Sequence, residues 1–279
     1  MLEIPEAATL SRQLTDTVAG KEIRSAAANT SPHKLTWYFG DPLSYNMLLS
    51  GRRIDSIHAL GGNVEIRMGN TRLLLQDGVN LRLLKPGAPI PARHQLHLSL
   101  EDGSSLVGVV QMYGGISAFI DGENQNPYYL VAKEKPSPLT DAFDEAYFTA
   151  LFNCKGFTKL SAKAFLATEQ RIPGLGNGVL QDILYRARLH PKRKMGTLSD
   201  AELTALYRAV KNALAAMAQA GGRDTERDLF GNAGGYVSIL SKNTVDMPCL
   251  VCGSGIKKEA YLGGSIYYCT GCQPLAEQQ

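Results

Sequence analysis

Four cysteines near the end of the chain have the types and spacing that most directly indicate chemistry. They form two Cys-x2-Cys pairs, Cys249/Cys252 and Cys269/Cys272, with sixteen residues between the pairs. This spacing is typical of a tetrahedral zinc site in which each pair of thiolates holds one face of the ion. Two disulfides are the alternative, but the first residues carry no signal-peptide pattern, and a reducing compartment disfavours disulfides. Because four protein ligands leave no open coordination position, we expect one structural zinc per chain.

The residues around these cysteines predict the element that holds them. Glycines at 253, 263, 264 and 271 can form tight turns, and the run 265–268 (Ser-Ile-Tyr-Tyr) is typical of a strand. The tail is therefore predicted to be a zinc-stapled β-hairpin.

A glycine-rich segment in the middle of the chain is the second candidate site. Residues 171–178 (Arg-Ile-Pro-Gly-Leu-Gly-Asn-Gly) lie between two predicted helices. Such a turn lets backbone N–H groups approach a phosphate, with Gly174 and Asn177 as candidate contacts. Arg186 begins a run of basic residues that can contact further phosphates. An ordinary helix–helix corner with a solvated basic end explains the same residues equally well.

The distribution of charge favours a polyanionic partner. Residues 151–227 carry 13 Lys and Arg against 6 Asp and Glu, whereas residues 1–150 carry 13 against 16. A basic segment of this kind is typical of proteins that bind nucleic acid, although solvated basic helices give the same count. No apolar run approaches the roughly 20 residues that a membrane-spanning helix needs.

Two larger domains are predicted to position these sites. Residues 5–17 predict an N-terminal helix, and short alternating runs between 23 and 119 predict a β-sandwich or barrel. The runs include 72–75 and 81–84, separated by Asp77-Gly78, and 105–110 and 116–119. Residues 120–138 show no periodic pattern and are expected to be a linker. Helical patterns follow over 141–154, 161–169, 178–187 and 199–220, the last with a capping box from Ser199 to Glu202. The expected fold is α+β, with a β-sandwich domain in 1–135, a helical domain in 136–235 and a zinc finger in 236–279.

These segments together resemble the formamidopyrimidine-DNA glycosylase / endonuclease VIII family. The run 174–177 (Gly-Leu-Gly-Asn), followed by 184–187 (Leu-Tyr-Arg-Ala) and a His-Pro pair at 190–191, is similar to that family's helix–two-turn–helix signature. The cysteine pairs resemble its zinc finger, and residues 3–6 (Glu-Ile-Pro-Glu) resemble its N-terminal motif. The resemblance is collinear over essentially the whole chain.

The resemblance implies a specific activity. Members of that family bind duplex DNA between their two larger domains and flip a damaged base out of the helix. Their N-terminal proline amine attacks the sugar C1′ to form a Schiff base, the base leaves, and elimination cuts the strand. The glutamate after that proline handles protons and contacts the sugar. By this resemblance, the partner is DNA with a lesion or an abasic site.

The chain departs from the family at the nucleophile. Leu2 stands where the family has proline, and leucine should block removal of Met1, so the free amine would belong to Met1. One extra residue adds about 3.5 Å of reach, and a misplacement of about 1 Å can cost about a hundredfold in rate. The expected chemistry is therefore altered.

Other expected DNA contacts also differ. The family's hairpin lysine falls at 61–63 (Gly-Gly-Asn), its finger arginine near Gly264, and its stack-filling methionine near Gly78. Met112 and Tyr113 stand where the family has an Arg-Phe pair that probes the opposite strand, and Tyr113 can still act as a wedge.

Several candidate site residues are retained. The resemblance implies Glu3 and Glu6 as catalytic groups, with the Met1 amine as a second possible nucleophile. Lys163 and Asn177 match phosphate-binding positions. Each also has a structural interpretation: Glu3 and Glu6 as acids in the first turn of a helix, Lys163 as a surface lysine and Asn177 as a turn residue. The DNA-binding candidates are Lys163, Gly174, Asn177, Arg186, Met112 and Tyr113.

These observations predict a DNA-binding protein of base excision repair. It would have altered or weakened hydrolysis of the N-glycosidic bond and poor AP-lyase activity. The alternative is a catalytically inactive reader of damaged or structured nucleic acid on the same scaffold, and an RNA-directed protein ranks last. We expect a monomer in the cytoplasm, associated with the nucleoid and not with a membrane.

Overall fold

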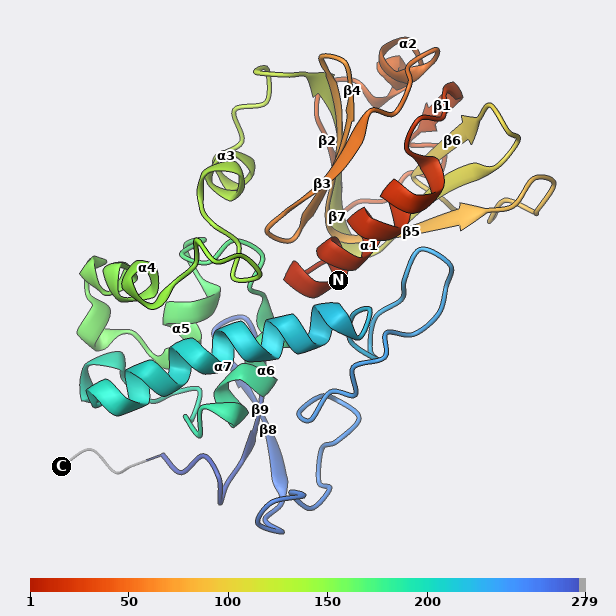
Figure 1. Cartoon of the computed structure of the whole chain (residues 1–279). Helices are drawn as coiled ribbons and strands as arrows, with labels where there is room; N and C mark the ends of the chain where they lie inside the picture. The colour runs from red at the N-terminus through yellow and green to blue at the C-terminus, as the bar shows by residue number, and fades with distance from the viewer. Residues whose placement is uncertain (276–279) are drawn as a thin grey trace.

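Helix α1 (Ile4–Val18) begins the chain in the computed structural model, which describes residues 1–275. A proline and a glutamate lie in its first turn, as the sequence predicts. Its buried face includes Leu10 and Leu14, which pack into the core of a β-rich lobe. Figure 1 shows α1 lying between that lobe and the long helix of a second, helical lobe.

The β-rich lobe is built on one hydrogen-bonded sheet. Its order is β1-β6-β7-β5-β4-β3, with antiparallel neighbours, and β2 pairs with β7 in parallel. The strands are β1 (Ile23–Ala28), β2 (Thr36–Tyr38), β3 (Ser56–Leu60), β4 (Asn63–Met68), β5 (Thr71–Leu84), β6 (Leu96–Leu100) and β7 (Ser105–Ile120). A short helix α2 (Tyr45–Leu49) covers part of it. The predicted β-rich N-terminal domain is confirmed.

Strands β5 and β7 are longer than the sequence predicts. Each spans two of the predicted runs, because the pairing continues past Asp77 with a register shift before Val79. Asp77 adopts a φ of 55°, so the Asp77-Gly78 pair forms a bulge within a strand instead of a turn between strands. The prediction of separate short strands at this place was wrong.

A helix occupies part of the segment predicted to be a linker. Helix α3 (Pro127–Glu134) begins where the Asn126 side chain accepts a hydrogen bond from the Tyr128 backbone N–H. Tyr129 from this helix is buried and packs edge-on against Phe119 of β7. The helix was missed because its eight residues are too few for a clear period.

The helical lobe contains α4 (Glu145–Ala150), α5 (Ala162–Ala167), α6 (Asn177–Arg186) and α7 (Asp200–Gln219). The capping box at Ser199 and Glu202 is present at the start of α7, as predicted. The expected single helix over 141–154 is shorter, because the Asp144 side chain caps it at the Tyr147 N–H. Ile4 of α1 belongs to the hydrophobic core of this lobe, so the first helix is packed into both lobes.

A two-stranded hairpin of β8 (Ile256–Tyr261) and β9 (Gly264–Cys269) completes the fold. Its backbone contacts α6, since the Tyr267 N–H donates to the Gln181 side chain at 3.0 Å. The predicted strand at 265–268 is therefore confirmed. In the described part of the chain, every helix is too short or too polar to cross a bilayer.

Candidate functional site

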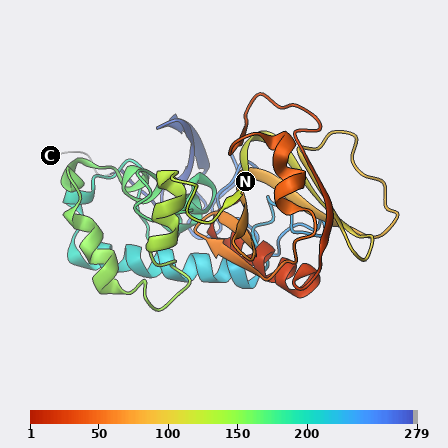
Figure 2. The ribbon, with the colours of Figure 1, turned by 90° about the horizontal axis from the view of Figure 1, so that it is seen from above.

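The first residues of the chain lie at the junction of the two lobes. The Leu2 N–H donates to the Asp77 carbonyl of β5 at 2.5 Å, and the Ile4 N–H donates to the Gly174 carbonyl before α6 at 3.1 Å. Figure 2 shows the N-terminus between the lobes. The N-terminal motif and the glycine-rich turn, about 170 residues apart in sequence, are thus adjacent in space.

Glu3 caps the N-terminus of α6. Its two carboxylate oxygens accept hydrogen bonds from the Gly178 and Val179 N–H groups, each at 2.8 Å, and the residue is only 3% exposed. The positive end of the helix stabilises this carboxylate. Burial nevertheless raises the pKa of Glu3, while the charge of Arg223 and the two N–H groups oppose that rise. A carboxyl group with a raised pKa is suited to exchanging protons.

Arg223 joins the two glutamates in a buried ion cluster. Its guanidinium donates to both Glu6 oxygens at 3.0 and 2.9 Å and lies 3.7 Å from Glu3, while its backbone N–H also reaches Glu6. Burial disfavours the charged form of Arg223 and by itself would lower its pKa. The charges of Glu3 and Glu6 outweigh this effect, so the pKa of Arg223 is raised. Gly178 leaves room for it, because a Cβ there would lie 1.7 Å from a guanidinium nitrogen. No pattern in the sequence pointed to Arg223.

The Met1 ammonium group contacts the Glu226 carboxylate in the segment after α7. A cavity beside them, lined in part by Leu2 and Glu6, has a volume of about 10 Å³. That is about the space one water molecule needs. The candidate nucleophile is therefore paired with a carboxylate of this chain, while Met1 itself is exposed at the surface.

Glycines let the lobes approach closely beside Leu2. The turn between β3 and β4 packs its Gly61 and Gly62 backbone against Pro173 and Gly174. Gly174 has a φ of 77°, and a Cβ on it would lie 2.0 Å from the Gly62 nitrogen. A Cβ on Gly62 would lie 3.0 Å from the Leu2 carbonyl oxygen. The position where the resemblance implies a lysine is thus tightly filled.

Tyr113 of β7 extends the site on the β-rich lobe. Its hydroxyl lies 3.4 Å from the Met1 sulfur, and burial, with the charges of Asp77 and Glu3, raises its pKa. Met112 beside it is largely exposed. A Cβ on Gly78 would lie 2.2 Å from the Tyr113 carbonyl oxygen, so no side chain fits there.

Lys163 and Asn177 are brought together beneath the β8–β9 hairpin. Lys163 Nζ donates to the Tyr261 carbonyl at 2.6 Å, and Asn177 Nδ2 donates to the Ser265 carbonyl at 2.8 Å. Lys163 is buried, which lowers its pKa. A Cβ on Gly264 would lie 3.5 Å from both nitrogens. Position 264, where the resemblance implies an arginine, therefore faces Lys163 and Asn177.

Arg186 lies away from these contacts. It donates to the Tyr236 hydroxyl at 3.2 Å, and Tyr236 in turn donates to Asp182 at 3.0 Å. Arg186 also lines an open groove of about 560 Å³ along α7, together with Thr204. Its assignment as a DNA contact stays a prediction.

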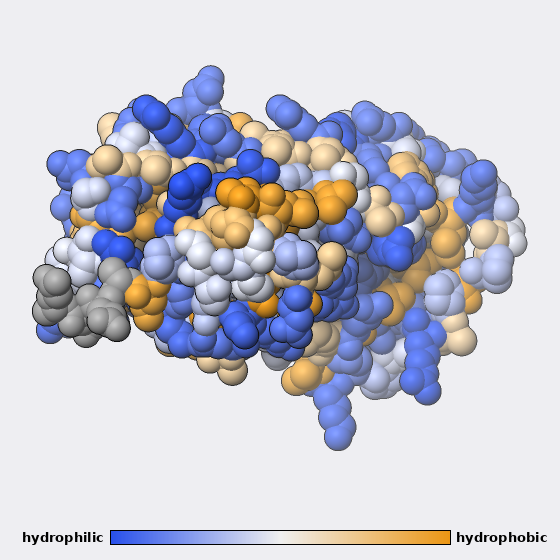
Figure 3. All heavy atoms as spheres, turned by 90° about the horizontal axis from the view of Figure 1, so that it is seen from below, coloured by the Kyte–Doolittle hydropathy of each residue, from blue (hydrophilic) through white to orange (hydrophobic). Residues whose placement is uncertain are grey.

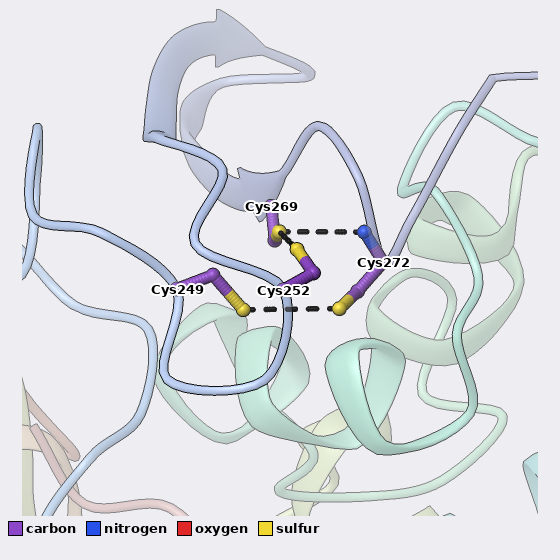
Figure 4. A group of neighbouring side chains, drawn as sticks. All are labelled: Cys249, Cys252, Cys269 and Cys272. Atoms are coloured by element: carbon purple, nitrogen blue, oxygen red, sulfur yellow. Dashed lines mark hydrogen bonds between the residues drawn. The ribbon is translucent and has the colours of Figure 1, made fainter.

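The four cysteines form a cluster that fits a zinc ion (Figure 4). Their sulfur atoms all lie within 4.8 Å of one another, with Cys249–Cys272 at 3.7 Å and Cys252–Cys269 at 3.4 Å. A tetrahedron with Zn–S bonds of about 2.3 Å has sulfur–sulfur edges of about 3.8 Å. All four cysteines are free of disulfides. The donor set is therefore that of a structural zinc finger.

The zinc cluster is fixed to the helical lobe. The Tyr185 hydroxyl of α6 lies 3.1 Å from Cys249 Sγ, which the sequence did not suggest.

Leu250 and Val251 between the first two cysteines are exposed. Figure 3 shows hydrophobic side chains gathered among hydrophilic ones on the underside of the molecule.

Comparisons with known proteins identify relatives that match nearly the whole chain. The family model "Formamidopyrimidine-DNA glycosylase H2TH domain" matches residues 135–228. The formamidopyrimidine-DNA glycosylases of Symbiobacterium thermophilum and Geotalea uraniireducens are each 30% identical to the chain. The alignments cover 99% and 98% of this chain and 90% and 100% of those proteins.

Solved structures show the same fold. The crystal structure of MutM (Fpg) from Thermus thermophilus is 25% identical, covers 97% of this chain and 98% of that one, and has a TM-score of 0.80. A Lactococcus lactis Fpg complex with DNA containing an abasic site is 23% identical, with a TM-score of 0.83 over 98% of this chain and all of the other. With full-length relatives, the matched helical domain and the zinc cluster in agreement, this chain belongs to the formamidopyrimidine-DNA glycosylase family.

Proposed function

We propose that this protein binds duplex DNA with a lesion or an abasic site and acts in base excision repair. The observation that carries the proposal is the convergence of the Met1 amine, Glu3 and the N-terminus of α6 at the junction of the lobes. An amine and a buried carboxyl group are the groups that the family's chemistry requires. The basic segment 151–227 and the zinc hairpin supply the surface for a sugar-phosphate chain.

The chemistry is proposed to be weakened relative to the family. Leu2 replaces the proline, so the nucleophile would be the primary amine of Met1. That ammonium group is paired with Glu226, and attack requires the pair to break and the proton to leave. Glu3, with its raised pKa, is the candidate for exchanging a proton with an attacking water or for stabilising positive charge on the sugar. We therefore expect slow base release and poor AP-lyase activity.

A catalytically inactive reader of damaged or structured nucleic acid is the second candidate. The ion pair between the Met1 ammonium group and Glu226 favours it, because a paired, protonated amine is a poor nucleophile. In both candidates, Asn177 and Lys163 already donate to carbonyl groups of the hairpin, so phosphate binding by these two side chains requires the hairpin to move.

Borohydride trapping on duplexes with an abasic site separates these candidates. A weak covalent adduct that maps to residue 1, together with slow strand cleavage, supports the amine mechanism. Base release without an adduct supports water attack, and tight binding with neither product supports the reader. Glu3→Gln should abolish base release, with Glu101→Gln at an exposed turn as the control. If the protein binds no DNA at low ionic strength, the proposed function is refuted.

Intact-mass measurement of the purified protein tests the identity of the terminal amine. We expect Met1 to be retained, and a mass lower by one methionine would contradict this. We further propose that the protein acts as a monomer in the cytoplasm at the nucleoid, with domains over 1–135, 136–235 and 236–279.

A further inference from the structure

Glu226 contacts the Met1 ammonium group from the segment that follows α7. The exposed fractions of Met1 and Glu226 are 38% and 23%, so the ion pair lies where a substrate can approach it. The backbone is fixed from the next residue onward, because the Leu2 N–H donates to the Asp77 carbonyl. An amine and a carboxylate are therefore held together at an accessible edge of the candidate site.

The terminal amine of this chain needs an external restraint. A proline amine belongs to a ring that limits its rotation, whereas the amine of a terminal methionine turns freely about its own bonds. A productive attack requires the reacting atoms to be held about 3–3.5 Å apart in a defined orientation. With Leu2 in place of the family's proline, the ion pair with Glu226 supplies the restraint that the Met1 amine lacks.

Glu226 lies in a segment that is anchored on both sides. Three residues before it, Arg223 makes its buried bidentate pair with Glu6. Three residues after it, Leu229 is fully buried in the core of the β-rich lobe, and its N–H donates to the Gln13 side chain at 3.0 Å. The Glu226 carboxylate is thus carried by a fixed backbone and can hold the amine in one place.

Three carboxylates and two cations meet around this ion pair. The Arg223 guanidinium lies 3.7 Å from Glu3 and 2.9 Å from Glu6. It also lies 3.9 Å from Glu226, which contacts the Met1 ammonium group. Repulsion among carboxylates that share one site favours a state in which one of them holds a proton. Among these three acids, Glu226 is the one to which an ammonium proton can pass directly.

We propose that Glu226 accepts a proton from the Met1 ammonium group and thereby frees the amine to attack the sugar aldehyde of an abasic site. This assignment rests on the proposed function, because it concerns the same terminal amine. The transfer leaves a neutral amine and a neutral carboxyl group. The amine nitrogen then bonds to C1′, and a second amine proton moves to the carbonyl oxygen. The Glu226 carboxyl group protonates that oxygen as water leaves, which gives the protonated Schiff base and restores the carboxylate.

The rate of borohydride trapping on a duplex with an abasic site, with the adduct mapped to residue 1 by mass spectrometry, measures this step. Glu226→Gln keeps the size of the side chain and a hydrogen-bond acceptor but cannot take the proton. We expect Glu226→Gln and Glu226→Ala to form the adduct about 100- to 10,000-fold more slowly, the range for loss of a general base. Binding of a duplex with a tetrahydrofuran abasic-site analogue should stay as in the wild type.

Sodium formate supplies a small carboxylate that can enter the space left by Glu226→Ala. We expect formate to restore part of the trapping rate of Glu226→Ala as its concentration rises, and sodium chloride at equal ionic strength to have no such effect. Glu226→Gln should not respond, because its amide fills the space. A purely structural role of Glu226 would not give this pattern. Glu101→Gln, at an exposed turn, is the control and should trap as the wild type does.

The outcomes separate this role from the proposed function, with thermal melts checking that every variant folds. If Glu226→Gln traps as fast as the wild type or faster, or if formate does not restore Glu226→Ala, proton acceptance by Glu226 is refuted. If the wild type binds the duplex but forms no adduct at residue 1, the role of Glu226 is refuted while DNA binding stands. If the wild type binds no DNA at low ionic strength, the proposed function fails as well.

Discussion

Replacing Arg223 by methionine should strongly destabilise the protein. Arg223 makes a bidentate pair with Glu6 and lies 3.7 Å from Glu3, and these side chains are 3–5% exposed. Methionine keeps the length of the side chain but leaves two buried carboxylates without a cation. Removing one partner of a buried ion pair typically costs about 3–5 kcal/mol. For a chain of this size, that corresponds to a drop of roughly 6–20 °C in Tm.

The loss should depend on pH in a defined direction. Burial already raises the pKa of Glu3, and the charge of Arg223 opposes that rise, so the pKa of Glu3 should increase further in Arg223→Met. A carboxyl group with a raised pKa in the folded state contributes stability below its unfolded pKa and loses it as pH rises through the folded pKa. The loss of unfolding free energy in Arg223→Met, relative to the wild type, is therefore expected to be largest near pH 7. This deficit should shrink as the pH falls toward the ordinary pKa of a glutamate, about 4.3.

Urea unfolding monitored by far-UV circular dichroism at pH 7 and at pH 5 measures this deficit. Arg208→Met, at an exposed position of α7, is the control and should change the unfolding free energy by less than about 0.5 kcal/mol. Adding Glu6→Gln to Arg223→Met should recover part of the loss, because one buried charge is removed. A deficit below about 1 kcal/mol at pH 7, or one that does not change with pH, would refute the reasoning.

Three further changes test other parts of the site. Cys249→Ser should release about one zinc per chain and unfold the hairpin, measured by metal analysis, and an unchanged zinc content contradicts the zinc site. Gly174→Ala should separate the lobes or destabilise them by at least about 1 kcal/mol, because its φ is 77° and its Cβ would meet Gly62; a melting temperature equal to wild type argues against this packing. Gly264→Arg should fold normally, since a Cβ there meets Lys163 and Asn177 at 3.5 Å, and should strengthen DNA binding with a steeper salt dependence; unchanged binding by fluorescence anisotropy counts against a phosphate site.

Features with local causes could be predicted from the sequence. The spacing of the cysteines, the capping box at Ser199 and the first-turn Pro5 of α1 each depend on residues a few positions apart. The Asp77-Gly78 pair misled the strand prediction, because a bulge and a turn use the same residue types. Helix α3 was missed because it is short and is held by Tyr129, which packs against Phe119 and donates a hydrogen bond to Glu65 of the distant strand β4.

The candidate site was predictable only in part. The sequence indicated Glu3, Glu6, Lys163 and Asn177, and the structure brings Glu3 to the start of α6 and places Lys163 and Asn177 together under the hairpin. Arg223 had no local signal, because it follows two glycines at the end of a helix and its partners come from the other end of the chain. Contacts between residues so distant in sequence produce no periodic pattern and no fixed spacing from which they could be predicted.

The ion cluster also has a consequence for how the protein is made. Glu6 and Arg223, which neutralises it, are 217 positions apart. Ribosomes that add roughly 5–20 residues per second therefore synthesise Arg223 about 10–40 s after Glu6. During that interval Glu6 lacks its counterion, and we expect a nascent chain truncated before residue 223 to be digested by proteases more readily than the full chain.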